Sequence, residues 1–331
     1  MNRNTFSLHS KTADRNTIVQ AANVLRNRGL VAFPTETVYG LGANAFDSYA
    51  VAKIFEVKNR PRFDPLIVHI RIHKDIKKVC SKVHKRAIPL IKKFWPGPLT
   101  ILLPKSEKIP DIVTAGLPTV AVRIPSHTIA QDLLRETKFP IAAPSANPFG
   151  YLSPTTAKHV EEQLGQKVDF ILDGGSCLFG IESTIIDFTS SDPTLLRPGG
   201  LPVEEIEKVV GDVKKLYRIS SKPRSPGQLQ SHYAPKTPIE ILHSNKQRIS
   251  KEKEIGLLAF SSSRKHSGFD MIEVLSPSGD LREAAANLFS CLHRLDKAGL
   301  DMIYAEPVDE TGLGRAIMDR LRRASTNCVS T

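Results

Sequence analysis

Short apolar runs and amphipathic helical patterns alternate along residues 15–211 of this 331-residue chain, and this alternation limits the folds open to it. Asp14 or Asn16 can cap a first helix, and Gly29 is expected to end it as the residue just beyond the C-cap. Further helices are predicted near 48–58, 82–94, 126–136, 155–164 and 203–210, and strands at 30–33, 66–70, 99–103, 119–124, 140–143, 168–172 and 183–188. This mixture predicts an α/β domain built on a twisted sheet, whereas the strand order cannot be read from the sequence.

A change of composition then divides the chain. Residues 213–237 are polar, basic and rich in Pro and Ser, which is typical of a linker. Beyond them, strands are predicted at 238–242, 256–260, 272–275 and 301–304, and helices near 280–298 and 313–323. We therefore expect a first domain over residues 12–211, a linker over 212–237 and a small C-terminal α/β domain over 238–331.

The formal charge of +12 comes from 46 Lys and Arg against 34 Asp and Glu. It suits a polyanionic partner such as a nucleotide or RNA, and a generally basic protein with a solvated surface explains it equally well. No apolar run approaches the roughly 18 residues of a membrane helix, and the first 16 residues lack the apolar core of a signal peptide. We expect a cytoplasmic protein without a membrane partner.

The four cysteines offer no metal clamp. Cys80, Cys177, Cys291 and Cys328 form no CxxC pair, and no His cluster completes a zinc site with them. Free and mostly buried thiols in a reducing compartment are expected.

Residues 58–69, KNRPRFDPLIVH, place three cations, Lys58, Arg60 and Arg62, in a segment broken by two prolines. The prolines exclude a helix there, and the apolar run at 66–68 predicts a buried strand directly after it. Cations on a rigid non-helical segment suit an anionic ligand. The anion we expect is the polyphosphate of a nucleotide.

Arg123 lies inside an alternating apolar run, PTVAVRIP, at residues 118–125. A charge in such a position is rarely buried without a partner. Two alternatives are open: Arg123 pairs with an internal carboxylate, or it receives the carboxylate of a ligand.

Other polar and charged residues lie at the ends of predicted strands, where α/β sheets bind ligands, or on turns. They are Thr35, Glu36 and Thr37, then Ser145 and Ser153, then Ser183, and finally Arg197 before a Pro-Gly-Gly turn. Each segment taken alone is equally well a plain turn or a surface hairpin. Ser145 is discounted as a nucleophile, because its surroundings lack a GxSxG elbow and no His and Asp partners are evident.

The chain has no Walker A loop, kinase signature or dense carboxylate cluster. A metal used here would be carried largely by substrate phosphates.

Seven segments together resemble one family. PTETVYGLG, KNRPRFDPLIVH, FWPGPLT, TVAVRIP, APSAN with SPT, GIESTIIDF and LLRPGG occur in the order seen in the threonylcarbamoyl-adenylate synthases. The resemblance to the family's YrdC-like domain covers residues 12–211. The HYAP motif and the tail beyond it are similar to the long form, which adds a small C-terminal α/β domain of Rossmann-like type. The resemblance implies a twisted open mixed sheet with a concave basic cleft.

The resemblance also implies the reaction and its residues. L-threonine, bicarbonate or CO2, and ATP would give threonylcarbamoyl-AMP and pyrophosphate, with Mg²⁺ carried mainly by the ATP phosphates. The product would feed threonylcarbamoyladenosine formation in tRNA through downstream tRNA threonylcarbamoyl transferase proteins. The residues implied for threonine are Thr35, His69, Arg123, Ala143 and Ser183, with Arg123 on the carboxylate. Those implied for ATP are Lys58, Arg62, Thr119, Ser145, Ser153, Arg197 and Tyr233, with Lys58 and Arg62 closest to the chemistry.

This chemistry fits the composition of the motifs. The threonine amine attacks CO2, a carbamate oxygen attacks the α-phosphorus, and pyrophosphate leaves, so no protein nucleophile is needed. The protein supplies proximity and charge stabilisation, for which many cations and few carboxylates are expected.

Two positions depart from the family pattern. Residues 228–231 are Gln-Leu-Gln-Ser, where the family commonly has basic residues before HYAP, which puts the linker's share in phosphate binding in doubt. Asp64 stands where Asn is common, and little effect is expected from it. Arg60 is left without a substrate role and is expected to pair with an internal carboxylate.

Two other functions compete with this hypothesis. A non-catalytic RNA-binding module could use the same basic cleft, but the sequence lacks RNA-reading aromatic signatures. A relative of the carbamoyltransferases of hydrogenase maturation would carry zinc-binding CxxC pairs, which this sequence does not have.

Overall fold

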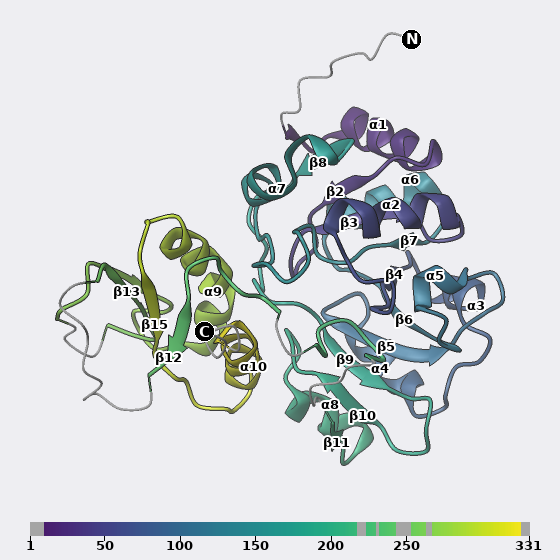
Figure 1. The fold of residues 1–331 in the computed structure, drawn as a ribbon. Coiled ribbons are helices and arrows are strands. Elements are labelled where there is room, and N and C mark those ends of the chain that lie inside the picture. Colours follow the sequence, from purple (N-terminus) through teal and green to yellow (C-terminus); the bar gives the residue numbers. More distant parts are fainter. Residues whose placement is uncertain (1–9, 217–222, 230–231, 243–252, 263–266, 326–331) are drawn as a thin grey trace, which may run out of the picture.

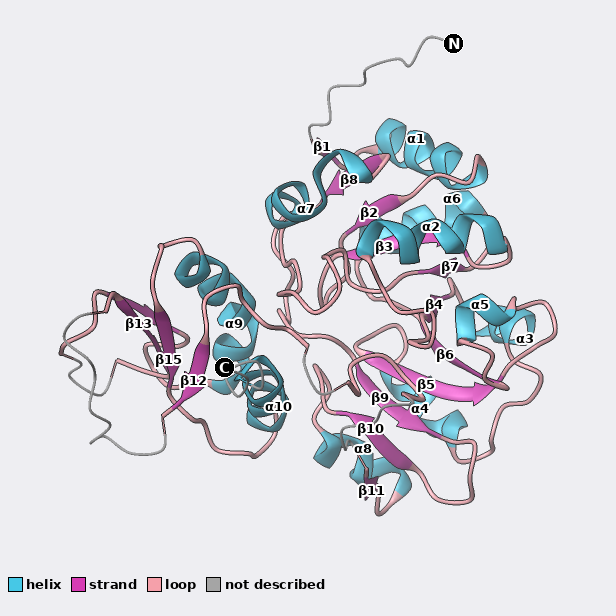
Figure 2. Cartoon of the chain, in the orientation of Figure 1, coloured by secondary structure: helices cyan, strands magenta, loops and turns pink. Residues whose placement is uncertain are grey.

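The structure is a computed structural model that describes residues 10–216, 223–229, 232–242, 253–262 and 267–325. Its strands form two sheets, one large and mixed and one small and parallel (Figures 1 and 2). The predicted α/β class is therefore confirmed. Within the described ranges, none of the helices has the length and apolar character needed to cross a bilayer.

The large sheet has eleven strands in the order β1-β8-β2-β3-β7-β4-β6-β5-β9-β10-β11. Parallel and antiparallel neighbours are mixed: β4 pairs with β6 in parallel, for example, and with β7 antiparallel. The strands are β1 (Lys11–Thr12), β2 (Val31–Phe33), β3 (Gly40–Asn44), β4 (Ile67–His69), β5 (Leu99–Pro104), β6 (Thr119–Arg123), β7 (Ile141–Ala142), β8 (Phe170–Asp173), β9 (Thr184–Asp187), β10 (Thr194–Arg197) and β11 (Lys214–Lys215).

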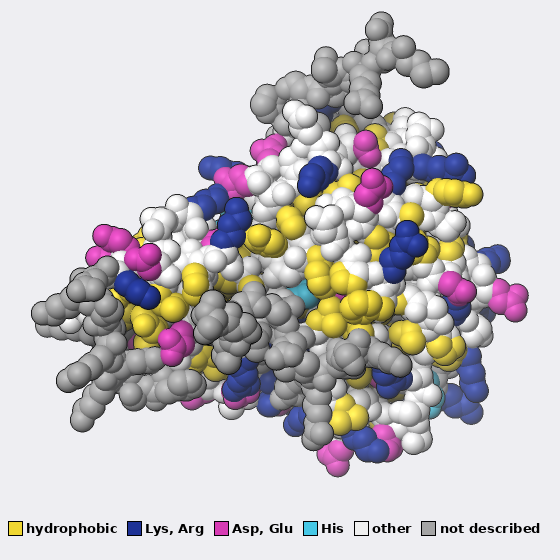
Figure 3. Space-filling view, in the orientation of Figure 1, with side chains coloured by type: hydrophobic (Ala, Val, Ile, Leu, Met, Phe, Trp, Pro, Cys, Tyr) yellow, Lys and Arg dark blue, Asp and Glu magenta, His cyan; other side chains and the backbone are white. Residues whose placement is uncertain are grey.

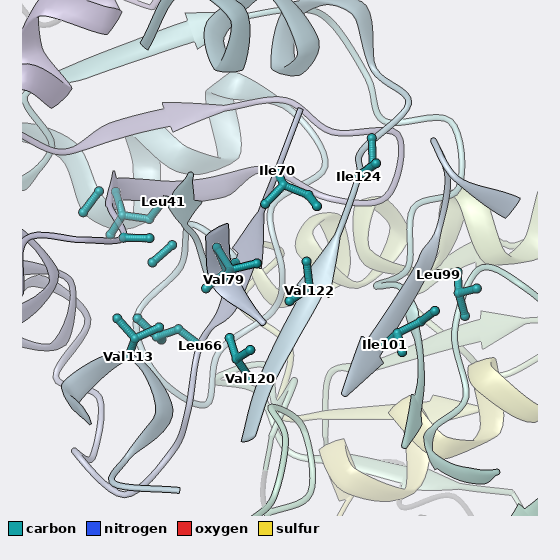
Figure 4. Packing of buried hydrophobic residues seen from close by; sticks show 14 of the residues in the cluster. Leu41, Leu66, Ile70, Val79, Leu99, Ile101, Val113, Val120, Val122 and Ile124 are labelled. Atoms are coloured by element: carbon teal, nitrogen blue, oxygen red, sulfur yellow. The ribbon is translucent and has the colours of Figure 1, made fainter. Parts of the chain in front are cut away.

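Helices cover this sheet and close its main apolar core. They are α1 (Arg15–Arg26), α2 (Ser48–Lys58), α3 (Ile76–Val79), α4 (Ala87–Phe94), α5 (Asp111–Thr114), α6 (Thr128–Thr137), α7 (Ala157–Leu164) and α8 (Val203–Val210), with 3₁₀ turns η1 (His73–Asp75) and η2 (Gly165–Lys167). Figure 4 shows part of this core, with Leu66 and Ile70 at the two ends of β4, Val120 and Val122 on β6, and Leu99 and Ile101 on β5. The buried apolar side chains hold the central strands rigidly, and the site described below lies at their ends.

Helix α1 illustrates how local chemistry sets the boundaries. Of the two predicted caps, Asp14 is used: its Oδ1 accepts from the Thr17 N–H at 2.7 Å, and the Thr17 hydroxyl accepts from the Asp14 N–H at 2.8 Å. The expectation for Gly29 was wrong by one position. Arg28 takes the left-handed conformation (φ 61°), and the Gly29 N–H returns to the Val24 carbonyl at 2.8 Å, which completes a Schellman motif.

Several elements were not predicted. Strand β3 reads GLGAN, without the β-branched residues that mark a strand, yet it pairs with both β2 and β7. The helix expected over 82–94 is only Ala87–Phe94, and a separate short helix, α3, precedes it. Strands β1, β10 and β11 and helix α5 were also missed, because elements of two to four residues carry too few side chains for a periodic signal.

The small sheet is entirely parallel, in the order β12-β15-β13-β14. Its elements are β12 (Ile239–Ile241), β13 (Ile255–Ala259), β14 (Met271–Val274), α9 (Leu281–Asp296), β15 (Met302–Ala305) and α10 (Gly314–Ser325). Figure 1 shows α9 and α10 on the side of this sheet that faces the larger one. Its apolar core continues across the junction, where Leu288 and Phe289 share one buried cluster with Val38, Leu152 and Ile181. The two sheets are thus joined by a packed interface and not only by a linker.

Candidate functional site

A pocket of about 40 Å³ lies where several strands of the large sheet end, and linker residues complete its wall. The register of the sheet explains the convergence: His69 at the end of β4 is opposite Arg123 at the end of β6, and Gly40 is bridged to Ser145. Its lining residues are Thr35, Thr37, Val38, Gly40, Arg60, Ile67, His69, Arg123, Ala143, Pro144, Ser145, Glu182, Ser183, Arg197, Pro226, Gly227, His232 and Tyr233. Figure 3 shows one face of the molecule, on which Lys and Arg side chains lie scattered and hydrophobic side chains gather near the middle.

The residues expected to contact threonine all line this pocket: Thr35, His69, Arg123, Ala143 and Ser183. Of those expected to contact ATP, Ser145, Arg197 and Tyr233 line it, whereas Lys58, Arg62, Thr119 and Ser153 do not. Thr119 begins β6 and shares a face of that strand with Arg123, but it is at the opposite end.

Arg123 is buried and has a carboxylate partner that the sequence did not identify. Its Nη2 lies 2.6 Å from Glu36 Oε1, its Nη1 donates to Thr37 Oγ1 at 2.8 Å, and its Nε donates to the Gly97 carbonyl at 3.1 Å. The first of the two alternatives, an internal carboxylate, is therefore realised in the structure. Nε and Nη1 each donate one hydrogen bond and Nη2 is ion-paired with Glu36, which leaves at least two of the five N–H donors for another acceptor.

His69 is buried beside Arg123. Its ring meets the Phe33 ring edge-on, with the centroids 6.0 Å apart. Burial, reinforced by the charge of Arg123, lowers the pKa of His69 to about 3. The imidazole is therefore neutral at physiological pH, and its buried Nδ1 has no hydrogen-bond partner within the described residues.

Lys58 and Arg62 are not displayed in the way the sequence predicted. Lys58 is the last residue of α2 and is only 1% exposed, and its Nζ donates to the backbone carbonyls of Ser145 (2.6 Å) and Asn147. Burial, and then the nearby charge of Arg60, lower the pKa of Lys58 well below its ordinary value. Arg62 is exposed on the following turn and lies outside the pocket lining. The prediction of a uniformly non-helical cationic segment was wrong because α2 extends through its first residue.

Arg60, which had no substrate role, is the cation of this segment that lines the pocket. Its Nη2 pairs with Asp64 at 2.8 Å, and both side chains are almost fully buried. The same group donates to the Pro65 carbonyl at 2.9 Å and lies 5.8 Å from the centre of the Phe149 ring. The expected internal carboxylate is thus Asp64. The expectation that Asp64 has little effect does not fit its position, since it balances a buried charge.

Arg60→Ala is expected to lower the free energy of unfolding by about 3–5 kcal/mol, because it leaves Asp64 buried without a counter-ion. Arg135→Ala is the matched control: its pair with Asp132 is exposed, and a loss of about 0–1 kcal/mol is expected. Urea unfolding of both variants measures the difference. Equal losses would contradict the structural role given to Arg60.

The turn after β7 is held by Lys58 and by its own amide side chain. Ser145 lines the pocket, and the Asn147 Nδ2 donates to the carbonyls of Pro148 (2.8 Å) and Tyr151 (2.9 Å). Ser153 is fully buried, and its hydroxyl donates to Glu182 Oε1 at 2.5 Å. Asn147 and Glu182 were not among the predicted site residues. The NP and IE dipeptides that contain them carry no local signal for burial.

Arg197 is hydrogen-bonded to Ser183, the residue that precedes β9. Its Nε and Nη2 donate to the Ser183 carbonyl at 3.1 and 2.9 Å, and Nη2 also reaches the Ser183 hydroxyl at 3.1 Å. That hydroxyl lies 2.7 Å from the Thr100 hydroxyl. Ser183 is therefore held in one orientation at the pocket wall.

The linker reaches the pocket through Gly227, His232 and Tyr233. Gln228, one of the four departures from the family pattern, is buried and accepts from the backbone N–H groups of Arg224 (2.7 Å) and Ser225 (3.2 Å), so it shapes the linker itself. Of the other departures, Leu229 binds Arg323 through its carbonyl, and Gln230 and Ser231 lie outside the described residues.

Comparisons with known proteins agree over both parts of the chain. A family model described as telomere recombination matches residues 23–199, and one described as the threonylcarbamoyl-AMP synthase C-terminal domain matches residues 201–326. The threonylcarbamoyl-AMP synthase of Pyrococcus abyssi is 46% identical over 92% of this chain and 93% of its own length. That of Bacillus subtilis is 42% identical over 93% and 92%. The crystal structure of the P. abyssi protein, Sua5, complexed with L-threonine superposes with a TM-score of 0.88 at 43% identity, covering 96% of both chains.

Proposed function

Because this chain belongs to the threonylcarbamoyl-AMP synthases, in their two-domain form, we propose that threonine, bicarbonate and ATP meet in the pocket at the ends of β4 and β6. The chain is a nucleotidyltransferase that uses ATP to make threonylcarbamoyl-AMP for tRNA threonylcarbamoyladenosine modification. The observation that carries the proposal is the convergence of Thr35, His69 and Arg123 with Ala143 and Ser183 on one wall. A related protein has been crystallised with L-threonine.

At the threonine end, Arg123 binds the substrate carboxylate with the two N–H groups it has left. Glu36, Thr37 and the Gly97 carbonyl hold the guanidinium in place, so its orientation is set before the substrate arrives. Neutral His69 and the hydroxyls of Thr35 and Ser183 contact the polar groups of the amino acid. Poor solvation in this pocket helps the threonine ammonium to lose its proton.

At the ATP end, Arg197, Ser145 and Tyr233 contact the nucleotide directly. Arg62 and Thr119, which lie outside the pocket lining, complete a cleft that we infer to be concave and basic. Lys58 and Ser153 act on the nucleotide indirectly, through residues that line the pocket. Lys58 fixes the turn that carries Ser145, and Ser153 holds the carboxylate of Glu182. A site of about 40 Å³ is far below the roughly 300 Å³ or more of a ligand-sized pocket, so the linker residues that line it must move for ATP to enter.

The reaction is a transfer between substrates that the protein aligns. The threonine amine attacks CO2 and forms a carbamate, a carbamate oxygen then attacks the α-phosphorus, and the bond from that phosphorus to the pyrophosphate oxygen breaks. The buried cations of the pocket stabilise the charge that grows on the leaving group. Proximity supplies a large part of the remaining acceleration.

Magnesium is expected to arrive with ATP. The described residues contain no group of three His, Cys, Asp or Glu side chains that could hold a metal. Two nearby carboxylates are engaged as well: Glu182, which lines the pocket, binds Ser153 and Arg320, and Glu36, which lies behind the lining, pairs with Arg123. An ion bound mainly through the ATP phosphates would need few protein ligands.

The product is a mixed anhydride that water destroys, so we propose that it is passed on in the cytoplasm to tRNA threonylcarbamoyl transferase proteins. The basic surface is a further candidate for direct contact with RNA.

Pyrophosphate release by the purified protein tests the function. We expect release that requires L-threonine, bicarbonate and ATP with magnesium, and a product that contains AMP. Omission of threonine and its replacement by D-threonine are the controls. A folded protein that releases no threonine-dependent pyrophosphate but binds RNA in a strongly salt-dependent way would instead support a binding module.

A further inference from the structure

Helix α10 of the C-terminal part lies against the catalytic part at several polar points. Arg315 bonds Glu204 of α8 at 2.9 Å, Arg320 bonds the carbonyl of Pro198 at 2.9 Å, and Arg323 bonds the linker carbonyl of Leu229 at 2.6 Å. Figure 1 shows α10 at this junction. One face of α10 is therefore fixed against the loops that carry the pocket.

Arg320 is the most deeply buried of these arginines, and its side chain is 0% exposed. Its Nε donates to Glu182 Oε2 at 2.9 Å, and its Nη1 donates to Asp319 at 2.7 Å as well as to Pro198. The guanidinium also lies 4.8 Å from the centre of the Tyr233 ring. A side chain from the C-terminal part thus touches three segments that form or support the pocket.

Glu182 links Arg320 to the substrate side. It lines the pocket and is 5% exposed, with one carboxylate oxygen bound to the Ser153 hydroxyl and the other to Arg320. Burial would raise the pKa of Glu182, but the charges of Arg320 and Arg197 and the Ser153 hydroxyl outweigh it, and the pKa lies below its ordinary value. Glu182 is therefore a fixed negative charge in a pocket that we assign to ATP.

We propose that Arg320 is a positioning residue of the active site: it orients Glu182 and offsets its charge, and through Glu182 it keeps Ser153 and the entrance to β9 in place. The inference rests on the function proposed above. It gives the C-terminal part a defined contribution to the reaction.

The physical reason is the proximity of like charges. A buried carboxylate without a counter-ion would turn away from Ser153 or repel the phosphates of ATP. Arg320 prevents both, since it neutralises Glu182 by binding the carboxylate oxygen that Ser153 does not bind. The Arg320 guanidinium also stacks over the ring of Tyr233 and so holds this linker residue, which we assign to ATP binding.

The test compares Arg320→Met with Arg322→Met in the full-length protein. Arg322 is on the same helix, but its side chain is 50% exposed and pairs with Glu310. We expect Arg320→Met to lower kcat/KM for ATP about 10- to 100-fold, as for a lost charged contact near the reacting phosphates. The KM for threonine should change less than the KM for ATP, and Arg322→Met should match the wild type.

A double-variant cycle separates positioning from stability. Glu182→Gln keeps an acceptor for Ser153 but removes the charge, so Arg320→Met/Glu182→Gln should be no worse than Arg320→Met alone. Arg320→Lys restores the charge and should recover part of the activity, even if Arg320→Met folds poorly. Losses that multiply in the double variant, or a lysine variant as inactive as the methionine one, would overturn the inference.

Failure of the proposed function would be recognised separately. A wild type without threonine-dependent pyrophosphate release refutes that function, whatever the variants do. Calorimetric ATP binding then still measures the effect of Arg320. Equal ATP affinity and equal activity in the wild type and Arg320→Met would overturn the positioning role.

Discussion

Lys58→Ala is expected to lower the rate of threonine-dependent pyrophosphate release about 10²-fold or more, as for the loss of a fixed electrostatic contact. Lys58 Nζ binds the carbonyls of Ser145 and Asn147 from inside the protein, so alanine frees the turn that carries Ser145. It also leaves two buried carbonyl groups without their donor, at a cost of about 1–3 kcal/mol each. A rate measurement at saturating threonine and ATP records the change.

Lys53→Ala is the matched control for Lys58→Ala. Lys53 is on the same helix, is exposed, and donates to the Arg28 carbonyl at 2.7 Å near the surface. A rate close to that of the wild type is expected for it. If Lys58→Ala were as active as Lys53→Ala, Lys58 would have no part in the reaction.

Arg123→Lys is expected to raise the KM for threonine about 10²-fold or more. Lysine keeps a positive charge beside Glu36 but loses the planar fork, so it cannot hold Glu36, Thr37 and a substrate carboxylate together. Two charged hydrogen bonds at about 1.5–3 kcal/mol each account for a change of this size. Steady-state kinetics with threonine and ATP varied separately should show the larger effect on threonine.

Arg135→Lys, an exposed arginine-to-lysine change, is the control for this variant. Circular dichroism of both proteins would show whether Arg123→Lys, which weakens the partner of the buried Glu36, has unfolded the protein. A threonine KM that stays the same in folded Arg123→Lys would leave Arg123 as a structural partner of Glu36 alone. In that case another group would have to bind the substrate carboxylate.

Much of the fold was open to prediction from local pattern. The longer helices and the strands with apolar or alternating runs were placed correctly to within a few residues, because their periodicity is written in consecutive side chains. Strand β3 and the two-residue strands β1 and β11 were missed because their backbone pairing, not their side chains, makes them strands. The strand order needs contacts between distant segments, which periodicity does not contain.

The site was predicted unevenly for a related reason. Residues at strand ends, such as His69 and Arg123, converge because neighbouring strands end together, and the motifs marked them. The cations of the 58–69 segment were harder to assign. Lys58 faces inward because it occupies the buried side of α2. Arg60 lies beyond the end of that helix and pairs with Asp64, four residues later in the chain. Charge alone did not separate these two from exposed Arg62.

The sequence by itself determined the α/β class, the family and the residues that we propose for threonine, all of which line one pocket, because these depend on local period and on the order of short motifs. Only the tertiary structure decided which charges are paired: Arg123 with Glu36, Arg60 with Asp64, and Glu182 with Arg320 from the far end of the chain. The reason is that pairing of buried charges is a property of distance in space. Glu182 and Arg320 come from distant segments and leave no joint pattern in one sequence, and the close spacing of Arg60 and Asp64 does not by itself show that the two side chains pair.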